Sequence, residues 1–330
     1  MTKFSKFRSH PSAFFADSDF RTVRNLGPPL IAALDKSEFL QGLLESPASA
    51  VVEASIPGLS CLAKSMQDRA RNRRRVTLAR ADWPKVSVIM AAYNAEATIG
   101  RSLTSLLKQT YSQLEILVVD DASRDETVRV VEQIRKGDDR VRLLMCEKNG
   151  GAATARNLGL RESQGEYIAF LDADDSAAPE RIEWQLSSLL QIGALVSVCN
   201  SKRVTRDGDR LRVNGRRFSK AVISMLFPRD PVLAEIGYML KLTIGEDSEY
   251  FQRAIAVFGK NKVNHLFETL LSQEFSPGSL LFSHGTTSRM ADRVEYQQAD
   301  EMKMALDEAL KLHEGIRQGT RSPYVPFAGF

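Results

Sequence analysis

The stretch VSVIMAAYN, residues 86–94, is an almost continuous apolar run that stops at two polar residues. Such a run is typical of a strand covered on both faces, as in a parallel sheet. Further apolar strands follow as EILVVD (115–120), VRLLMC (141–146) and EYIAFLD (166–172). Apolar residues at helical spacing fill the intervals and predict helices at about 95–109, 126–136, 152–162 and 178–192. This alternation predicts an α/β fold with a doubly wound, mostly parallel sheet.

The chain after residue 193 predicts a mixed, less regular arrangement. Asp207-Gly208 lies between two apolar stretches and predicts a hairpin turn. Pro228 and Pro231 are expected to break the chain before the next helix. The remaining elements expected are helices at about 232–237, 247–258 and 295–315 and a strand at 262–269. We therefore divide the chain into a helical, basic N-terminal extension (1–85), two halves of one α/β domain (86–200 and 201–288), and a C-terminal helix with a tail (289–330).

The composition is that of an ordinary globular protein. The 330 residues are 43% hydrophobic and 26% charged, which excludes wholesale disorder and a small disulfide-stapled scaffold. No apolar run reaches the ~18 residues of a membrane helix, and no secretory signal follows the N-terminal basic residues. The three cysteines are far apart and form no CxxC pair, which is typical of a reducing compartment. We expect a cytoplasmic protein.

A basic segment joins the extension to the α/β domain. Between Lys64 and Lys85 the sequence has eight basic and two acidic residues. Such a segment is first of all typical of a solvated linker or helix face, and it is also compatible with peripheral contact at the inner membrane surface or with a protein partner. No nucleic-acid-binding motif accompanies it, so we expect no nucleic-acid partner.

Acidic residues follow two of the predicted strands, at Asp120-Asp121 and at Asp172-Ala173-Asp174-Asp175. Because parallel strands end at one edge of a sheet, we expect these carboxylates on a common ligand-binding edge. Asp172 and Asp174 are two residues apart, so extended backbone directs both to the same side. Mg²⁺ and similar cations are held by one or two carboxylates together with substrate phosphates. The pattern predicts a metal-diphosphate site, although acidic pairs also cap helices and shape turns.

Two further segments complete the candidate site. In KNGGAATARNLG (148–159) the glycines allow a tight turn, and Arg156 follows where it could point towards a phosphate or a base. Gly245-Glu246-Asp247 precedes a predicted helix, where a carboxylate acts as a general base or simply favours the helix dipole. The sequence has neither a GxGxxG after its first strand nor a Walker A pattern, which argues against a dinucleotide site and a P-loop.

Together, VSVIMAAYN, ILVVDDASRDET, NGGAATARNLG, GEYIAFLDADD and GED resemble glycosyltransferase family 2, inverting enzymes of the GT-A fold, over about residues 85–285. The resemblance implies transfer of a sugar from a nucleotide-diphosphate donor, usually a UDP-sugar, assisted by Mn²⁺ or Mg²⁺. It implies an acceptor hydroxyl on a carbohydrate, a lipid-linked saccharide or a protein, in the synthesis of a surface polysaccharide or glycoconjugate. Residues 86–200 would bind the donor, and 201–288 would bind the acceptor and supply the base.

The resemblance also implies residue roles. Tyr93 would stack on the base, Asp121 would hydrogen-bond it, and Asp174 would ligate the metal. Asp247 would be the catalytic base, with Glu246 orienting a substrate. The implied donor-binding residues are Ala91, Tyr93, Asp121, Arg156, Asp172 and Ala173.

Several features depart from parts of this family or leave alternatives. The segment Gln252–Ala256 does not match the QxxRW motif of processive synthases. His284 lies in a Gly-flanked loop and is either a metal-side residue or a surface residue. A nucleotidyltransferase, which would carry a Gly-rich, Arg-containing loop at 91–94, and a non-catalytic sugar-nucleotide-binding subunit remain the alternative functions.

Overall fold

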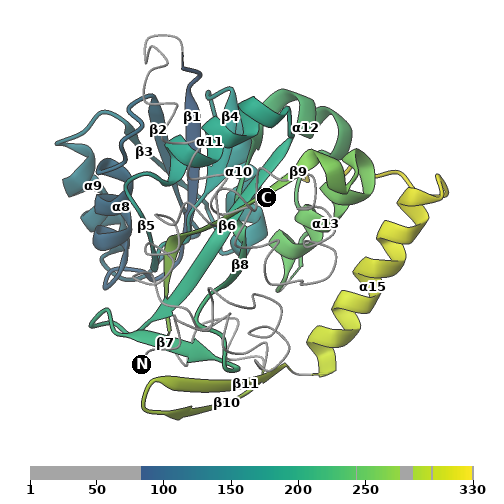
Figure 1. Cartoon of the computed structure of the whole chain (residues 1–330). Coiled ribbons are helices and arrows are strands. Elements are labelled where there is room, and N and C mark those ends of the chain that lie inside the picture. The colour runs from purple at the N-terminus through teal and green to yellow at the C-terminus, as the bar shows by residue number, and fades with distance from the viewer. Residues whose placement is uncertain (1–82, 243, 276–284, 299, 329–330) are drawn as a thin grey trace, which may run out of the picture. The chain divides into compact units, whose positions relative to one another are not determined.

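A computed structural model describes residues 83–242, 244–275, 285–298 and 300–328 (Figure 1). These belong to one compact unit that spans Arg71–Phe330. Residues 1–82 of the predicted extension, nearly all of the basic segment and His284 lie outside the described residues.

The first half of this unit is a parallel sheet. Its strands stand in the order β3, β2, β1 and β4. Their bounds are Val141–Met145, Leu114–Asp120, Val86–Ala92 and Tyr167–Phe170, and the helices between them are α8 (Ile99–Leu107), α9 (Thr127–Arg135) and α10 (Ala152–Glu162). Every residue of β2 is buried, which explains its uninterrupted apolar sequence. The predicted doubly wound, mostly parallel sheet is confirmed.

Helix α10 approaches β1 closely because of one glycine. A Cβ added to Gly159 would lie 2.4 Å from Cγ2 of Ile89, which is itself fully buried in β1. Any larger residue would force the helix away from the sheet. Gly159 therefore fixes the position of α10, the helix that carries Arg156.

The second half of the sheet is mixed. The antiparallel strand β8 (Ser219–Pro228) lies beside β4, and β6 (Val196–Val204) follows it. The remaining strands are β5 (Asp175–Ala177), β7 (Arg210–Val213), β9 (Val263–Glu274), β10 (Gly285–Met290) and β11 (Arg293–Gln298). Strand β9 runs parallel to β6 and also pairs with the short β5, while β7, β11 and β10 extend the far edge.

Five further helical segments cover or flank this half. They are α11 (Arg181–Ile192), α12 (Arg229–Ile236), α13 (Glu246–Phe258), the short 3₁₀ helix η2 (Lys260–Lys262) and α15 (Asp300–Arg317). Three aromatic rings connect α13 to the sheet: Phe227 of β8 lies between Phe170 of β4 and Tyr250 of α13, at 5.9 Å centroid distance from each. This packing holds the start of α13 near the ends of the strands.

Three expectations for the second half are corrected. Pro231 does not interrupt the chain, because it lies in the first turn of α12, where a missing N–H costs no helical hydrogen bond. Pro228 is the last residue of β8, a strand that the sequence reading did not recognise. The helix expected at 295–315 begins only at Asp300, because residues 293–298 form β11.

The hairpin at Asp207-Gly208 is confirmed: β6 and β7 pair antiparallel on either side of it, and Gly208 adopts a φ of 90°. Among the described helices, none has the length and apolar character needed to cross a membrane.

Candidate active site

A cavity of about 900 Å³ lies at the carboxyl ends of the parallel strands, where open α/β sheets bind their ligands. Its walls come from the loops after β1 and β4, from the first turns of α10 and α13, from β6, β8 and β9, and from α15. Most of the residues predicted from the sequence line it, and these are Ala91, Tyr93, Arg156, Asp172, Ala173, Asp174, Glu246 and Asp247.

The end of β1 gives the cavity an aromatic surface. Tyr93 directly follows this strand, is 48% exposed and lines the cavity together with the partly buried Ala91. An exposed ring beside a small residue offers a flat face for stacking, and base–aromatic stacking contributes about 1–3 kcal/mol. The predicted stacking role of Tyr93 therefore remains a prediction with a suitable geometry.

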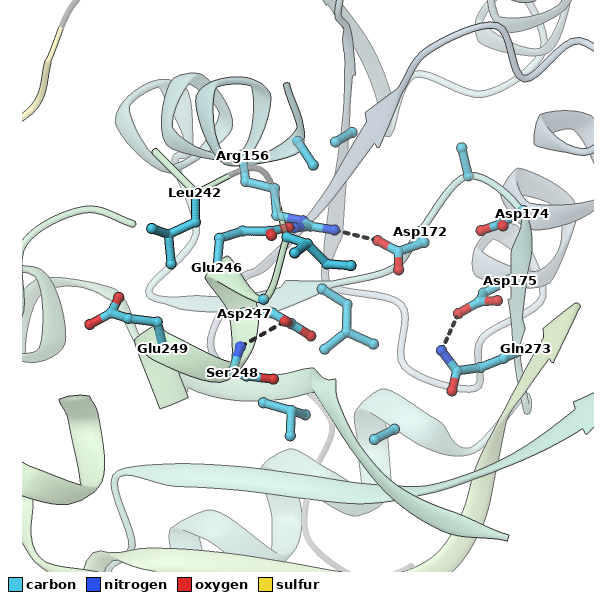
Figure 2. A pocket seen from close by; sticks show the side chains of 18 of the residues that line it. Arg156, Asp172, Asp174, Asp175, Leu242, Glu246, Asp247, Ser248, Glu249 and Gln273 are labelled. Carbon is cyan, nitrogen blue, oxygen red and sulfur yellow. Dashed lines mark hydrogen bonds and ion pairs between the residues drawn. The ribbon is translucent and has the colours of Figure 1, made fainter. Parts of the chain in front are cut away.

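Arg156 lies between the two acidic parts of the cavity (Figure 2). Its guanidinium donates to Asp172 Oδ1 at 2.7 Å and to a carboxylate oxygen of Glu246. Arg156 and Glu246 are both buried. Burial opposes the charge of the guanidinium, but Asp172 and Glu246 outweigh it and raise the pKa of Arg156. Arg156 thus joins the loop after β4 to the first turn of α13.

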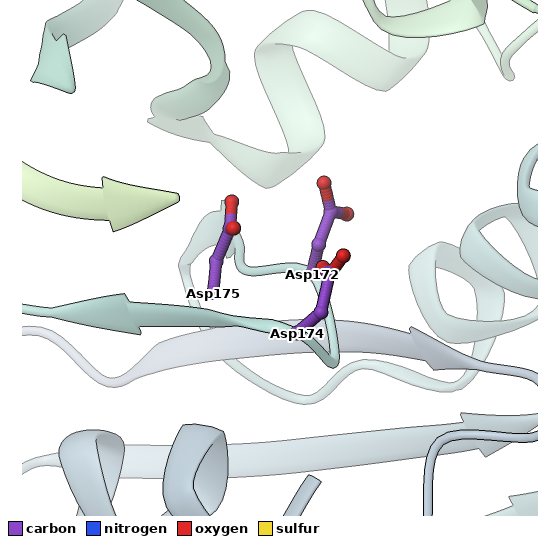
Figure 3. A group of neighbouring side chains, drawn as sticks. All are labelled: Asp172, Asp174 and Asp175. Atoms are coloured by element: carbon purple, nitrogen blue, oxygen red, sulfur yellow. The ribbon is translucent and has the colours of Figure 1, made fainter. Parts of the chain in front are cut away.

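Three carboxylates after β4 form a cluster. Oxygens of Asp172, Asp174 and Asp175 lie within 4.8 Å of one another, and all three side chains point to the same side of the chain (Figure 3). Burial and the neighbouring Asp172 raise the pKa of Asp174 to about 6. Burial and the two other carboxylates raise the pKa of Asp175 well above its usual value. This mutual repulsion is relieved by a proton or by a cation.

The cluster fits a divalent cation of the Mg²⁺ or Mn²⁺ type. All its potential ligand atoms are carboxylate oxygens, which such ions prefer. Gln273 of β9 donates to Asp175 Oδ2 at 2.9 Å and so fixes the orientation of that carboxylate. Arg101 of α8 donates to the backbone oxygen of Asp174 at 2.9 Å and pairs with Glu274. Gln273 and Arg101 therefore hold the loop after β4 in place, and the side chains of Asp172 and Asp174 line the cavity.

Asp247 lies in the first turn of α13 and faces the same cavity. Burial raises its pKa to about 6, while Arg156 opposes this rise and Glu246 adds to it. The Ser248 N–H donates to Asp247 Oδ1 at 2.7 Å (Figure 2). Gly245, with a φ of 82°, makes the turn into the helix. A partly exposed carboxylate with a pKa near neutrality is suited to accept a proton.

Two residues that were expected to contact a substrate, Asp121 and Glu246, instead bind other groups of the protein. Asp121 is buried and does not line the cavity. Its two oxygens accept hydrogen bonds from the N–H groups of Gly150 (2.9 Å) and Gly151 (2.7 Å). The expected common edge of carboxylates is thus divided, because Asp121 holds the glycine turn while the cluster after β4 faces the cavity. Glu246 is likewise engaged, since its carboxylate pairs with Arg156.

Asp120 also has a local role. Its Oδ2 accepts from the Ser123 N–H at 3.0 Å, so it shapes the turn after β2, one of the two alternatives that its sequence position allowed.

Helix α15 reaches the cavity through a buried ionic group. Arg253 of α13 donates twice to Glu249, at 2.8 and 2.9 Å, and His313 Nε2 lies 3.3 Å from Glu249 Oε1. His313 lines the cavity and is 2% exposed. This contact fixes α15 against α13, and no motif in the sequence indicated it.

The comparisons with known proteins agree with this geometry. Residues 87–245 match the family described as Glycosyl transferase family 2. The putative teichuronic acid biosynthesis glycosyltransferase TuaG of Bacillus subtilis is 38% identical over 131 residues, which are 39% of this chain and 52% of that protein. WfgD of Escherichia coli, a UDP-Glc:alpha-D-GlcNAc-diphosphoundecaprenol beta-1,3-glucosyltransferase, is 47% identical over 106 residues, which are 32% of this chain and 41% of that protein.

A solved structure shares the fold. The crystal structure of S. aureus TarS 1-349 in complex with UDP-GlcNAc superposes with a TM-score of 0.52 at 24% identity, covering 62% of each chain. Residues 87–245 therefore form a glycosyltransferase family 2 domain, and this domain has the GT-A fold. The chain spans about half the length of the curated relatives it matches, as with TuaG and with an uncharacterized glycosyltransferase of Haemophilus influenzae, covered to 53%.

Sequence reasoning missed several residues of the site. Asp175 stands in the DADD segment, so its signal was present but was assigned to Asp172 and Asp174 alone. Gln273 and Arg101 carry no recognisable motif, because their importance depends on strand pairing and helix packing that bring distant segments together. Arg203, close enough to lower the pKa of Asp174, was equally inconspicuous.

Proposed function

We propose that the protein is an inverting glycosyltransferase that transfers a sugar from a UDP-sugar to an acceptor hydroxyl during the synthesis of a surface polysaccharide or glycoconjugate. Two relatives support this, since TuaG is a putative teichuronic acid biosynthesis glycosyltransferase and WfgD is a glucosyltransferase that uses UDP-Glc. The cytoplasmic location, and the division into a donor-binding half (86–200) and an acceptor-binding half (201–288), remain part of this proposal.

One observation carries the proposal. Asp247 and the cluster of Asp172, Asp174 and Asp175 face one cavity, and Arg156 lies between them (Figure 2). An inverting transfer needs a base on one face of the sugar and charge neutralisation of the leaving diphosphate on the other. The cavity offers both groups on different elements.

In this proposal Asp247 accepts the proton of the acceptor hydroxyl. The freed oxygen electrons form a bond to the anomeric carbon, and the bond from this carbon to the diphosphate oxygen breaks on the opposite face. The electrons leave with the nucleoside diphosphate, so the configuration inverts in a single step. A pKa near 6 leaves Asp247 mostly ionised at neutral pH, as a base must be.

The remaining residues bind and orient. Tyr93 provides the surface for the base, and Arg156 holds Asp172 and Glu246 in place. A divalent cation bound at Asp174 and its neighbours would supply Lewis-acid stabilisation of the leaving diphosphate.

The test is a thermal-shift screen followed by transfer assays. UDP with Mn²⁺ is expected to raise the melting temperature more than either alone, because a ligand that binds only the folded state stabilises it. UDP-sugars with saccharide acceptors are then expected to give an inverted product. Absence of stabilisation by any UDP-, GDP- or dTDP-sugar would contradict the proposal. Binding without turnover would favour a non-catalytic subunit, and pyrophosphate release from a nucleoside triphosphate would favour a nucleotidyltransferase.

A further inference from the structure

The segment that follows α15, residues 322–327, has two different sides, and we call it the tail segment. Its residues alternate between exposed and partly buried, as in a strand. The partly buried residues are Pro323, Val325 and Phe327, whereas Tyr324 is exposed. One side of the tail segment therefore packs against the protein and the other faces solvent.

The backbone of the tail segment is bonded to the turn that follows α12. Val325 and Gly237 form a short parallel bridge. The Tyr238 N–H donates to the Val325 oxygen at 2.9 Å, and the Val325 N–H donates to the Ile236 oxygen at 3.1 Å. A Cβ added to Gly237 would lie 2.0 Å from the Val325 oxygen, so the close approach requires glycine.

An aromatic side chain extends this contact to α10. The Phe327 ring meets the Tyr238 ring edge-on, with 5.1 Å between the centroids. The guanidinium carbon of Arg161, on α10, lies 4.4 Å from the centroid of the Phe327 ring. Both geometries are attractive, the first between two rings and the second between a cation and a ring. Phe327 thus connects the turn after α12 to the helix that carries Arg156.

Arg253 connects the tail segment to α13. It is 1% exposed and donates to the Pro323 oxygen at 3.1 Å. It also donates to the oxygens of Ile236 and Tyr238, at 2.5 and 2.8 Å. Its two remaining bonds hold the carboxylate of Glu249. All five N–H groups of the guanidinium are thus used, and one buried side chain joins the tail segment, the turn after α12 and α13.

The turn after α12 leads into the wall of the cavity. Met239 exchanges two hydrogen bonds with the Asn157 side chain of α10, at 2.8 and 2.9 Å. Leu242 and Gly245 then line the cavity, and Asp247 follows in the first turn of α13 (Figure 2). The tail segment therefore holds the chain at the start of the stretch that ends at Asp247.

We propose that the tail segment positions Asp247, through the turn after α12 and through Arg253. The inference rests on the proposed function, in which Asp247 is the base, and adds the part of the chain that sets the place of its carboxylate. The tail segment lies beyond residues 87–245, which match the family. A base acts only within hydrogen-bond reach of its proton, and a displacement of about 1 Å can lower a rate by about 10²-fold.

The experiment compares Phe327→Ala with two matched variants of the full chain. Phe327→Tyr keeps the ring and is expected to keep its contacts, and Tyr324→Ala removes a ring from the exposed side of the same segment. Hydrogen exchange of the stretch 237–247 is measured by mass spectrometry. The kcat for UDP release from UDP-glucose and from UDP-N-acetylglucosamine is measured with methyl β-glucoside and water as acceptors, and the UDP dissociation constant by calorimetry.

In Phe327→Ala, exchange in 237–247 is expected to be at least about tenfold faster, because the contacts that hold the turn are weakened. Its kcat is expected to fall about tenfold while the UDP dissociation constant stays within about twofold of the wild type. Phe327→Tyr and Tyr324→Ala are expected to match the wild type in all three measurements.

Three results would overturn the inference. The first is faster exchange with an unchanged kcat, which would make the contact purely structural. The second is an equal loss of kcat in Tyr324→Ala, and the third is a parallel loss of UDP affinity, which would place the effect in the donor site. If the wild type releases no UDP from either donor, the proposed function fails; if it does and Phe327→Ala is equally active, this inference alone fails.

Discussion

Two groups of carboxylates follow neighbouring strands of the same sheet, yet they differ in what satisfies them. Asp121, after β2, receives hydrogen bonds from two backbone N–H groups of the Gly150-Gly151 turn. Asp174, after β4, lies beside Asp172 and Asp175, and its pKa rises to about 6. The first carboxylate is stabilised by the fold, whereas the second is destabilised by its neighbours.

The groups that surround a carboxylate therefore distinguish a structural acid from a ligand-binding acid better than its position at the end of a strand does. Backbone amides are fixed donors that compensate a carboxylate within the protein. Carboxylates that lie close together repel one another, and a proton or a bound cation relieves this repulsion. Perturbed groups of this kind gather at functional sites.

The largest effect is expected from Asp174→Asn. Removing a carboxylate from the cluster is expected to lower the transfer rate by at least about 10³-fold, because metal-based charge stabilisation contributes several kcal/mol. The melting temperature of the metal-free protein should stay equal or rise, since repulsion is relieved. The matched control is Asp230→Asn, a carboxylate that is 80% exposed on α12 and lies outside the cavity. Retained metal-dependent transfer in Asp174→Asn would contradict the comparison.

Asp247→Asn is expected to lower transfer by about 10²-fold or more, because it removes the proposed general base. Donor binding should stay within about threefold of the wild type, measured as the UDP dissociation constant by calorimetry. The two variants thus separate the roles: Asp174→Asn is expected to weaken metal-dependent donor binding as well as transfer, whereas Asp247→Asn is expected to weaken transfer alone. A variant at Asp247 that no longer bound UDP would show that this residue belongs to the donor site.

Asp121→Asn tests the other side of the comparison. The amide offers one acceptor oxygen where the carboxylate offers two, so one backbone N–H loses its charged partner. The free energy of unfolding is expected to fall by about 1.5–3 kcal/mol, which denaturant titration measures. Unchanged stability with lost UDP binding would instead support the base-contacting role that the family resemblance implied.

The smallest effect concerns pH and metal. Asp174 ionises near pH 4 when unfolded but at about pH 6 when folded, so the folded state binds more protons between these values. The stability of the metal-free protein is therefore expected to fall as the pH rises from about 4 to 6. At pH 8, Mg²⁺ should restore a melting-temperature shift of about 2–4 °C per kcal/mol of binding. Asp174→Asn is expected to reduce both the fall in stability with pH and the shift caused by Mg²⁺. If the metal-free wild type became more stable between about pH 4 and 6, the raised pKa of Asp174 would be contradicted.

The first half of the fold was predictable because its strands are buried on both faces. A continuous apolar run such as residues 86–92 has one simple explanation, and the acidic residues at strand ends follow from the parallel topology. The partners of those residues were not predictable. Whether Asp121 meets a nucleotide base or the amides of Gly150 and Gly151 depends on distances between loops that sequence spacing does not encode.

The second half was harder for a physical reason. Strands β10 and β11 are rich in polar residues and lie at the edge of the sheet, and Val294 is the buried residue of β11 on which their packing depends. Such strands show neither a two-residue nor a helical hydrophobic period. In β8 the polar start at Ser219 and Lys220 and the terminal Pro228 hid a strand whose centre is buried.

Arg156 serves as counter-ion to both sides of the cavity at once, and this has a thermodynamic consequence. Its charge is divided between Asp172, beside the cluster after β4, and Glu246, beside Asp247. A ligand that weakens or strengthens the ion pair between Asp172 and Arg156 changes the proton affinity of Asp247. By thermodynamic linkage, protonation of Asp247 changes the affinity for that ligand by the same factor. Ligand binding at the cluster after β4 and protonation of Asp247 are thereby coupled through a single side chain.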